Sequence, residues 1–231
     1  MGPGKATIGM PAASSHPVSR RTWMMFGLAI LAGAAVSAGL RMLPDKGQKL
    51  TLTPVVAKVL NDRDAPSAGP GRAEVIIVVY TDYQCAVCKR TDGALERIVA
   101  VDPGVRVIYK DWPILGEASV AAALAALAAD RQGKYLAVHL ALMASRAPLD
   151  EAQIRRVAIA AGADWPRLMA DRTDHARTIE AQLGRHGMEA WSLGIPGSPG
   201  YLVGPYLIKG GLDDRDLARA VARARRAGPP R

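Results

Sequence analysis

The chain has few cysteines and few aromatic side chains. It contains two Cys residues and one Phe among 231 residues, and aromatic residues make up 5% of the sequence. A core rich in aromatic rings is therefore excluded. Apolar residues nevertheless account for 49% of the chain, so a sizeable core can be built mainly from Ala, Leu, Val and Ile.

The two cysteines are Cys85 and Cys88, separated by two residues. A disulfide that closes so short a loop removes little entropy from the unfolded chain, so it would be a poor structural brace. Zinc would need two more ligands, usually a second pair at short spacing, and the histidines show no such pairing. We therefore predict a redox-active pair and no metal site. His139, His175 and His186 are interpreted as surface or helix-packing residues.

The charge balance is strongly basic, with a formal net charge of +9 and a pI near 9.9. Such a balance raises the possibility of nucleic-acid binding, but no aromatic interleaving or nucleic-acid motif accompanies the arginines. They are scattered through the helical segments and concentrated in the C-terminal tail (Arg219, Arg223, Arg225, Arg226 and Arg231). We interpret them as a solvated basic surface and expect no nucleic-acid partner.

The N-terminal part contains an uncharged apolar run over residues 23–40, preceded by Arg20 and Arg21. Three interpretations are open: a cleaved secretory signal with a small-residue site at residues 36–38, an uncleaved membrane anchor, or a twin-arginine export signal. A buried core helix is the remaining alternative. We expect residues 1–43 to be a signal or anchor that places the rest of the chain outside the cytoplasm.

The cysteines follow a segment that is typical of a buried strand, residues 75–80 (VIIVVY). Asp82 is a helix-start signal, and helical spacing continues to residue 99, so Cys85 is expected at a helix N-terminus, where backbone N–H groups favour a thiolate. Residues 105–110 alternate like a second strand. This order predicts a right-handed strand–helix–strand unit with parallel strands.

The remaining sequence divides into a helical block and a C-terminal strand pair. The helical pattern runs from residue 117 to about 190, and a Pro- and Gly-rich loop over residues 194–200 ends it. Two short strands and a final helix follow. We predict a linker over residues 44–72, with a short helical or extended piece at residues 55–60. One folded domain is predicted over residues 73–231, with a helical insertion at about residues 115–192.

Three segments together resemble the DsbA-like branch of exported bacterial thiol–disulfide oxidoreductases. They are residues 82–89 (DYQCAVCK), 110–116 (KDWPILG) and 194–199 (GIPGSP), and the likeness extends from about residue 62 to the C-terminus. The resemblance implies an α/β fold: a thioredoxin-like fold with an inserted all-helical subdomain, here preceded by the N-terminal signal or anchor helix. It also implies a cis peptide bond before Pro199, packed against the cysteines.

The same resemblance implies how the site would work. Cys85 would be the attacked and attacking sulfur, and Cys88 would resolve the mixed disulfide. The backbone of Ser198 would pair with an incoming peptide, while Pro199 leaves no N–H pointing at the sulfurs. The implied partners are thiols or disulfides of exported proteins and a membrane redox partner that resets the dithiol. No cofactor is implied.

The sequence departs from that family pattern between and before the cysteines. Ala86 and Val87 supply no His between them, and Val79 stands where many relatives carry a buried Glu that assists proton transfer. Asp82 is the nearest remaining carboxylate. Its role is open between a helix cap and proton handling.

The predicted function is a protein disulfide oxidoreductase, most simply an oxidase that forms disulfides in exported proteins at the periplasmic or extracytoplasmic face. A reductase or isomerase is the first alternative, although residues 44–72 look too short for the dimerisation domain that such isomerases usually carry. The second alternative is a thioredoxin-like module that holds peptides or copper through its thiolates without turnover.

Overall fold

A computed structural model describes residues 47–228 of the chain, so the predicted signal or anchor over residues 1–43 lies outside the described residues. In chain order the elements are β1 (Gln48–Lys49), α2 (Pro54–Leu60), β2 (Ser67–Ala68), β3 (Val75–Thr81), α3 (Ala86–Val101), β4 (Val105–Asp111), α4 (Glu117–Asp130), α5 (Tyr135–Ala144), α6 (Glu151–Ala160), α7 (Trp165–Asp174), α8 (Ala176–Ser192), β5 (Gly200–Val203), β6 (Tyr206–Lys209) and α9 (Asp214–Ala227).

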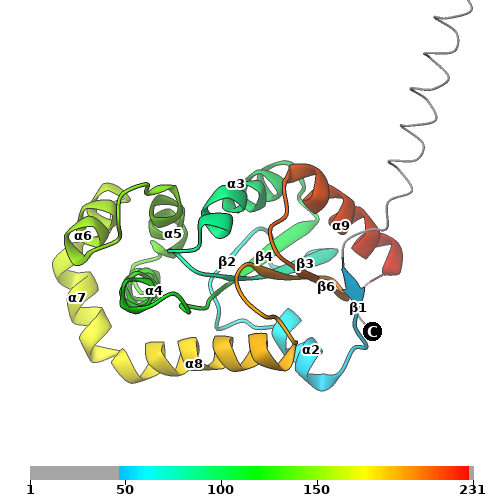
Figure 1. Cartoon of the computed structure of the whole chain (residues 1–231), viewed down its shortest axis with the longest axis horizontal. Coiled ribbons are helices and arrows are strands. Elements are labelled where there is room, and N and C mark those ends of the chain that lie inside the picture. The colour runs from blue at the N-terminus through cyan, green and yellow to red at the C-terminus, as the bar shows by residue number, and fades with distance from the viewer. Residues whose placement is uncertain (1–46, 229–231) are drawn as a thin grey trace, which may run out of the picture. The chain divides into compact units, whose positions relative to one another are not determined.

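The strands form one six-stranded sheet in the order β1-β6-β5-β3-β4-β2 (Figure 1). The central pair, β3 and β4, is parallel over its full length, from Val75 opposite Val105 to Thr81 opposite Asp111. The helix α3 connects this pair, so the predicted strand–helix–strand unit is confirmed. The other neighbouring strands pair antiparallel, including the β5–β6 hairpin.

Helices cover both faces of the sheet, which explains why β3 is apolar without interruption. Successive side chains of a strand point to opposite faces. Ile77 and Val79 accordingly enter the apolar cluster that includes α3 and α9, whereas Val78 and Tyr80 enter the cluster beneath α2 and α8. Figure 1 shows α3 and α9 on one side of the sheet and α2 and α8 on the other.

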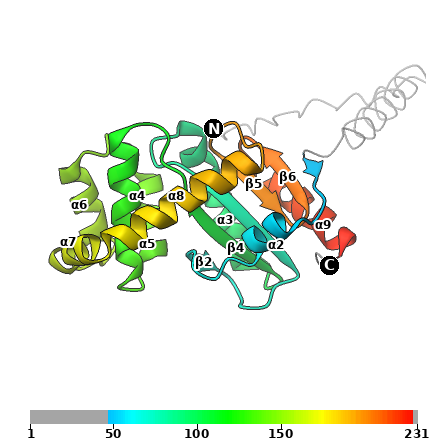
Figure 2. The same cartoon turned by 90° about the horizontal axis from the view of Figure 1, so that it is seen from below.

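Five helices, α4 to α8, lie between β4 and β5. The helix α4 is rich in alanine, and its small side chains let α5, α6, α7 and α8 all pack against it. Five helices thus form a block in which α4 is the shared partner. Figure 2 shows α8 leaving this block and running back along the sheet, where it covers the face that it shares with α2.

The predicted linker over residues 44–72 is not a linker in its described part. The strands β1 and β2 extend the two edges of the sheet by pairing with β6 and β4. The helix α2 buries Val56, Val59 and Leu60 against the sheet, and the side chain of Thr53 caps its N-terminus. A two-residue strand is too short to show alternation, which is why the sequence pattern did not predict β1 and β2.

Within residues 47–228, no helix is both long enough and apolar enough to cross a membrane.

Candidate active site

Cys85 stands at the start of α3, immediately after a tight turn that follows the central strand. The carboxylate of Asp82 accepts a hydrogen bond from the backbone N–H of Gln84 at 2.7 Å, and the carbonyl of Asp82 accepts one from the N–H of Cys85 at 3.1 Å. Cys85 is itself the N-cap of α3, and its Sγ accepts the backbone N–H of Cys88 at 3.3 Å. A backbone N–H and the positive end of the helix therefore face this sulfur, and both favour its thiolate.

The two sulfurs differ in accessibility. Both are free thiols; Cys85 is 8% exposed and Cys88 2% exposed. Burial raises the pKa of the Cys88 thiol to about 12, and its hydrogen bond with Cys85 adds to the effect, while the Thr81 hydroxyl and the backbone N–H of Asp82 act in the opposite direction. Cys88 thus stays protonated at neutral pH, and Cys85 is the sulfur that a reactant can reach.

The loop before β5 meets the cysteines. The Ser198–Pro199 peptide bond is cis, which confirms the expectation from the sequence. The Cys85 thiol donates to the carbonyl of Ser198 at 3.3 Å, so residues far apart in the chain are in contact. Pro199 is buried, and its own carbonyl accepts the N–H of Gly210 at 2.9 Å. In Figure 1 this loop, in orange, approaches the start of α3.

The small size of Gly200 is required where this loop enters β5. A Cβ on Gly200 would lie 2.5 Å from a side-chain carbon of Ile195, which is closer than carbon atoms approach. Ile195 is fully buried in the apolar cluster on this face of the sheet. The Gly at residue 200 therefore lets the end of the loop pack closely against Ile195 of the same loop, next to Ser198, whose carbonyl contacts Cys85.

Asp82 holds the active-site turn through several hydrogen bonds. The helix-cap role that the sequence left open for Asp82 belongs instead to Cys85. Besides Gln84, the buried carboxylate of Asp82 accepts the N–H groups of Ile114 at 2.7 Å and Leu115 at 3.0 Å, and the hydroxyl of Ser119 at 2.6 Å. These bonds join the turn before Cys85 to the loop after β4 and to the first turn of α4.

A buried polar chain beside the turn was missed by the sequence analysis. The Tyr83 hydroxyl lies 2.8 Å from Nδ1 of His139, and Nε2 of His139 lies 3.1 Å from a carboxylate oxygen of Asp92. Tyr83 precedes the cysteines, Asp92 is in α3 and His139 is in α5, and all three are buried. His139 is therefore a hydrogen-bonding core residue that ties α5 to the active-site helix. Separations of 56 and 47 residues leave no signal in the sequence.

Two further buried groups lie at the end of β4. Tyr135 donates to the carboxylate of Asp111 at 3.0 Å. Burial raises the pKa of Asp111 to about 6, although the nearby His139 acts in the opposite direction. Nδ1 of His186 donates to the Asp111 carbonyl at 3.1 Å. Burial, with the nearby charge of Lys110, lowers the pKa of His186 to about 3. His186 is thus a neutral core residue.

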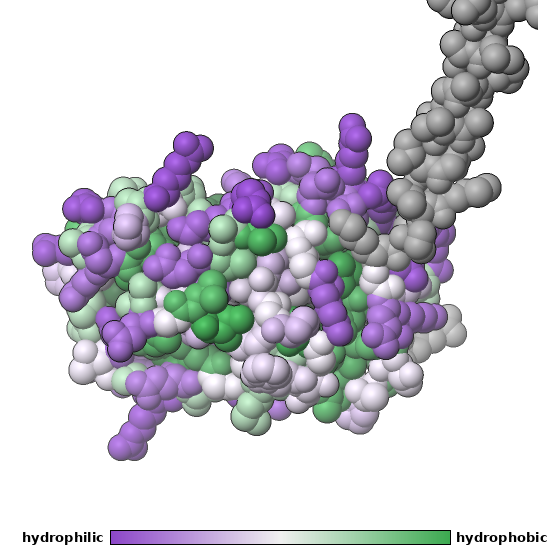
Figure 3. Space-filling view, in the orientation of Figure 1, coloured by the Kyte–Doolittle hydropathy of each residue, from purple (hydrophilic) through white to green (hydrophobic). Residues whose placement is uncertain are grey.

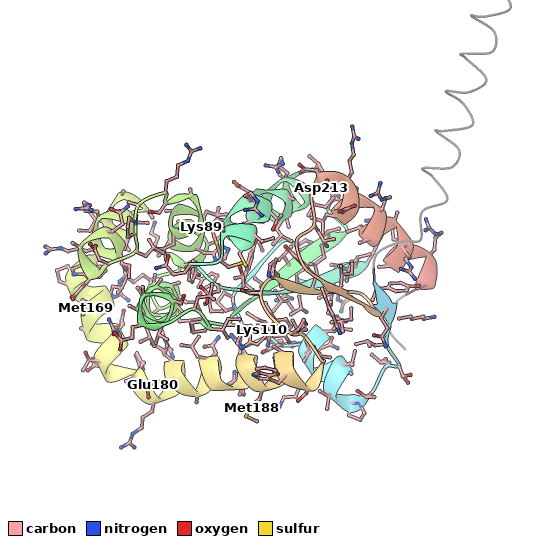
Figure 4. All side chains as sticks on the ribbon, in the orientation of Figure 1. Lys89, Lys110, Met169, Glu180, Met188 and Asp213 are labelled. Carbon is pink, nitrogen blue, oxygen red and sulfur yellow. The ribbon has the colours of Figure 1, made fainter. Side chains whose placement is uncertain are left out.

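Two lysines tie different pairs of elements together, and both are labelled in Figure 4. Lys110 is completely buried and pairs with Asp62 and, at 2.9 Å, with Glu189, which ties β4 to α8 and to the segment after α2. Lys89 lies in the first turn of α3. Its ammonium donates to the Ser145 carbonyl at 2.7 Å and so reaches across to the end of α5.

For the described residues 47–228, no three His, Cys, Asp or Glu side chains gather where they would hold a metal ion.

A reduced dithiol at the start of a helix, after the central parallel strand and against a cis-proline loop, defines the class of thiol–disulfide oxidoreductases with a thioredoxin fold. Within this class the chain belongs to the DSBA-like thioredoxin domain family, whose model matches residues 76–222.

Solved structures agree with this assignment. A thioredoxin-like oxidoreductase from Silicibacter pomeroyi DSS-3 is 38% identical, with a TM-score of 0.69 over 73% of this chain and 96% of that one. A periplasmic thioredoxin-like protein from Salmonella enterica serovar Typhimurium is 29% identical, with a TM-score of 0.67 over 77% of this chain and 99% of that one.

The curated relatives that the chain matches are much longer proteins. The Na⁺/H⁺ antiporter NhaA 3 of Salinispora tropica is 28% identical over 217 residues, which is 89% of this chain and 31% of the antiporter. The chain thus spans about a third of the length of that relative.

Proposed function

We propose that this protein is an extracytoplasmic thiol–disulfide oxidoreductase that forms disulfides in exported proteins through Cys85 and Cys88. The observation that carries the proposal is the hydrogen bond from the Cys88 N–H to Cys85 Sγ at the N-cap of α3, 3.3 Å long. Stabilising the Cys85 thiolate stabilises the reduced enzyme, and a stable reduced form makes the disulfide form a better oxidant.

The first step is attack on the disulfide form. A substrate thiolate bonds to Cys85 Sγ, the Cys85–Cys88 bond breaks, and its electron pair leaves with Cys88. The raised pKa of Cys88, about 12, makes this sulfur take up a proton at once. Protonation weakens Cys88 as a nucleophile, so it does not readily expel the substrate again.

The second step releases the product. Another substrate thiolate attacks the substrate sulfur of the mixed disulfide, and Cys85 leaves as a thiolate held by the helix N-terminus. Two electrons pass from two substrate thiols to the enzyme, which becomes a dithiol, and the substrate gains one disulfide. The reaction runs in reverse when the enzyme starts reduced.

The residues around the sulfurs have supporting roles in this proposal. Ser198 is partly exposed, so its backbone is open to pair with an incoming extended peptide, and Pro199 keeps any donor N–H away from the sulfurs. Asp82 acts as a positioning residue, since its four hydrogen bonds hold the turn before Cys85. Proton handling by Asp82 would be an additional role.

A complete cycle requires export and a redox partner. We propose that residues 1–43 export or anchor the chain and that a membrane redox partner removes the two electrons from the dithiol. The periplasmic location in the name of the Salmonella relative supports this setting. Ion transport, which the name of the Salinispora relative describes, is not part of the proposal, because the match covers 31% of that protein.

The test compares three reactions of the purified protein: oxidation of a reduced, unfolded secreted protein, reduction of insulin disulfides, and recovery of a scrambled substrate. The proposal predicts that the disulfide form drives the first reaction fastest. Fastest insulin reduction would indicate a reductase, and fastest recovery of the scrambled substrate an isomerase. Absence of all three would leave a peptide- or copper-binding module and overturn the enzyme assignment.

A further inference from the structure

We propose that a basic groove beside Cys85 selects substrates that carry acidic side chains near the reacting cysteine. This inference rests on the proposed function and names its substrate class. The groove has a volume of about 870 Å³. We define it by its lining residues: Gln84, Ala86, Lys89, Arg90, Met143, Ala144, Ser145, Arg146, Ala147 and Pro148.

The position of the groove ties it to the dithiol. Gln84 and Ala86, the two chain neighbours of Cys85, form part of its wall, and Lys89 and Arg90 continue that wall along the first turns of α3. The opposite wall is the end of α5 and the loop that follows it. A substrate whose sulfur bonds to Cys85 therefore places the residues next to its cysteine in or beside the groove. Figure 4 shows Lys89 between α3 and α5.

The charge of the groove has one sign. Its lining contains Lys89, Arg90 and Arg146, and no carboxylate. In the part of the chain that the structure describes, none of these three cations forms an ion pair. By contrast, Arg97 and Arg225 bind carboxylates of Asp214 and of Glu74 and Asp102. The groove thus differs from a basic surface that is already neutralised by the protein.

Lys89 is the cation best placed to meet a substrate. One of its three donor hydrogens is used by the Ser145 carbonyl, which fixes the ammonium at the boundary between the two walls. Burial lowers the pKa of Lys89, so the protein supplies too little negative charge to offset the desolvation of the ammonium. A substrate carboxylate would supply it. Figure 3 shows hydrophilic side chains along the edge formed by α3 and α5.

The apolar part of the lining limits what else fits. Met143, Ala147 and Pro148 supply apolar side chains to the lining, so a peptide gains apolar contact area there and charge contact at the cations. A peptide with Lys or Arg beside its cysteine would meet three like charges. The expected occupant is an extended acidic segment of a protein substrate.

The experiment compares two peptides that differ only in charge. Each has one central cysteine, flanked on both sides by Glu in one peptide and by Gln in the other, and each is supplied as the free thiol. The Cys85–Cys88 disulfide form of the protein takes two electrons and two protons from two peptide thiols, which become a disulfide-linked dimer, and the protein becomes a dithiol. The reaction is stopped with acid, and the peptide dimer is measured by chromatography.

The wild type is expected to react roughly tenfold faster with the Glu peptide than with the Gln peptide at low ionic strength. The variant Lys89→Gln/Arg90→Gln/Arg146→Gln should bring the ratio of the two rates to about 1–2, and 1 M salt should do the same to the wild type. The control Arg131→Gln/Lys134→Gln/Arg177→Gln removes equal charge from exposed residues outside the groove and should keep the ratio.

Equal rates for the two peptides, or an equal loss of preference in both triple variants, would overturn the groove as a selectivity site while leaving disulfide exchange intact. Failure of the disulfide form to oxidise either peptide would instead contradict the proposed function itself. The two hypotheses therefore fail in distinguishable ways.

Discussion

The Cys85 thiol donates to the carbonyl oxygen of Ser198 at 3.3 Å, across a separation of 113 residues. This contact joins the start of α3 to the loop that enters β5, and it places the reactive sulfur beside backbone that an extended peptide can reach. The helical insertion between β4 and β5 lies between these two segments in the sequence but does not separate them in the structure.

The unequal burial of the two sulfurs predicts different fates for the single Ser variants. Cys88→Ser should accumulate a mixed disulfide at Cys85 when incubated with oxidised glutathione, because no second thiol is present to resolve it. Cys85→Ser should form little adduct at Cys88, which is 2% exposed and has a pKa raised by burial to about 12. Intact-mass spectrometry over a time course measures both. Equal adduct in the two variants would contradict the assignment of Cys85 as the attacking sulfur.

The hydrogen bonds of Asp82 predict a large effect for a small change. Asp82→Asn replaces one carboxylate oxygen with an NH₂ group, which cannot accept the N–H and O–H bonds that this oxygen accepts. The free energy of unfolding should therefore fall by about 2–4 kcal/mol. Asp150→Asn is the matched control, since Asp150 is the exposed N-cap of α6 and Asn caps a helix equally well. Urea unfolding of both variants at neutral pH measures the difference. Equal stabilities would show that Asp82 does not hold the turn.

The contact between Gly200 and Ile195 predicts destabilisation by a single methyl group. Gly200→Ala would bring a Cβ within 2.5 Å of the Ile195 side chain and should lower the free energy of unfolding by about 1–3 kcal/mol. The double variant Gly200→Ala/Ile195→Leu should recover part of the loss, because leucine lacks the Cγ2 atom that makes the closest contact. Gly184→Ala is the control, because nothing lies within 4 Å of its Cβ position. Calorimetry of the four proteins tests this; no loss in the Gly200 variant would refute the contact.

The burial of His186 in its neutral form predicts that the free energy of unfolding falls in acid. The folded state lowers its pKa from 6.5 to about 3, so the unfolded state binds the proton more tightly, and acidification favours unfolding. The contribution of this residue is complete above about pH 6.5 and is lost as the pH falls toward 3, amounting to roughly 3–5 kcal/mol. His186→Gln should show a shallower loss between pH 6.5 and 4 than the wild type in urea titrations. His175→Gln, at a partly exposed residue, should retain the wild-type slope.

The burial of the Asp111 carboxyl predicts an effect of pH on stability of the opposite sign. Its folded pKa of about 6 lies above the ordinary value of 3.8, so its contribution is complete below about pH 3.8 and is lost as the pH rises through 6. Asp111→Asn should therefore remove a destabilisation that grows in the wild type as the pH rises from 4 to 6.5. In the same urea titrations, the variant should gain more stability with rising pH than the wild type does. An unchanged slope would contradict a buried carboxyl with a raised pKa.

The parts of the fold that were predicted from the sequence have local signals. The apolar run of β3 and the helical spacing after Cys88 are periodic over several residues, and the short return to β4 leaves a parallel strand–helix–strand unit as the natural topology. The motif around Pro199 carried the expectation of a cis bond, which the structure confirms. These features are readable because each one is contained in a few consecutive residues.

The parts that were missed depend on contacts between distant segments. The strands β1 and β2 have two residues each and exist because β6 and β4 offer unpaired edges. His139 was interpreted as a surface or packing residue, and only the folded chain brings Tyr83 and Asp92 to its two nitrogens. Such buried polar pairs have no periodicity, since each partner is chosen by the tertiary structure.

The central claim is that Cys85 and Cys88 form a reversible redox pair poised for oxidation. Its most direct test is to equilibrate the protein with glutathione buffers of defined ratio, stop the exchange with acid and measure the disulfide fraction by mass spectrometry. The account predicts a two-electron transition, with the Cys85–Cys88 disulfide as product and a reduction potential between roughly −180 and −120 mV. A potential near about −270 mV would contradict the oxidase assignment, and a pair that never forms the disulfide would contradict the redox site itself.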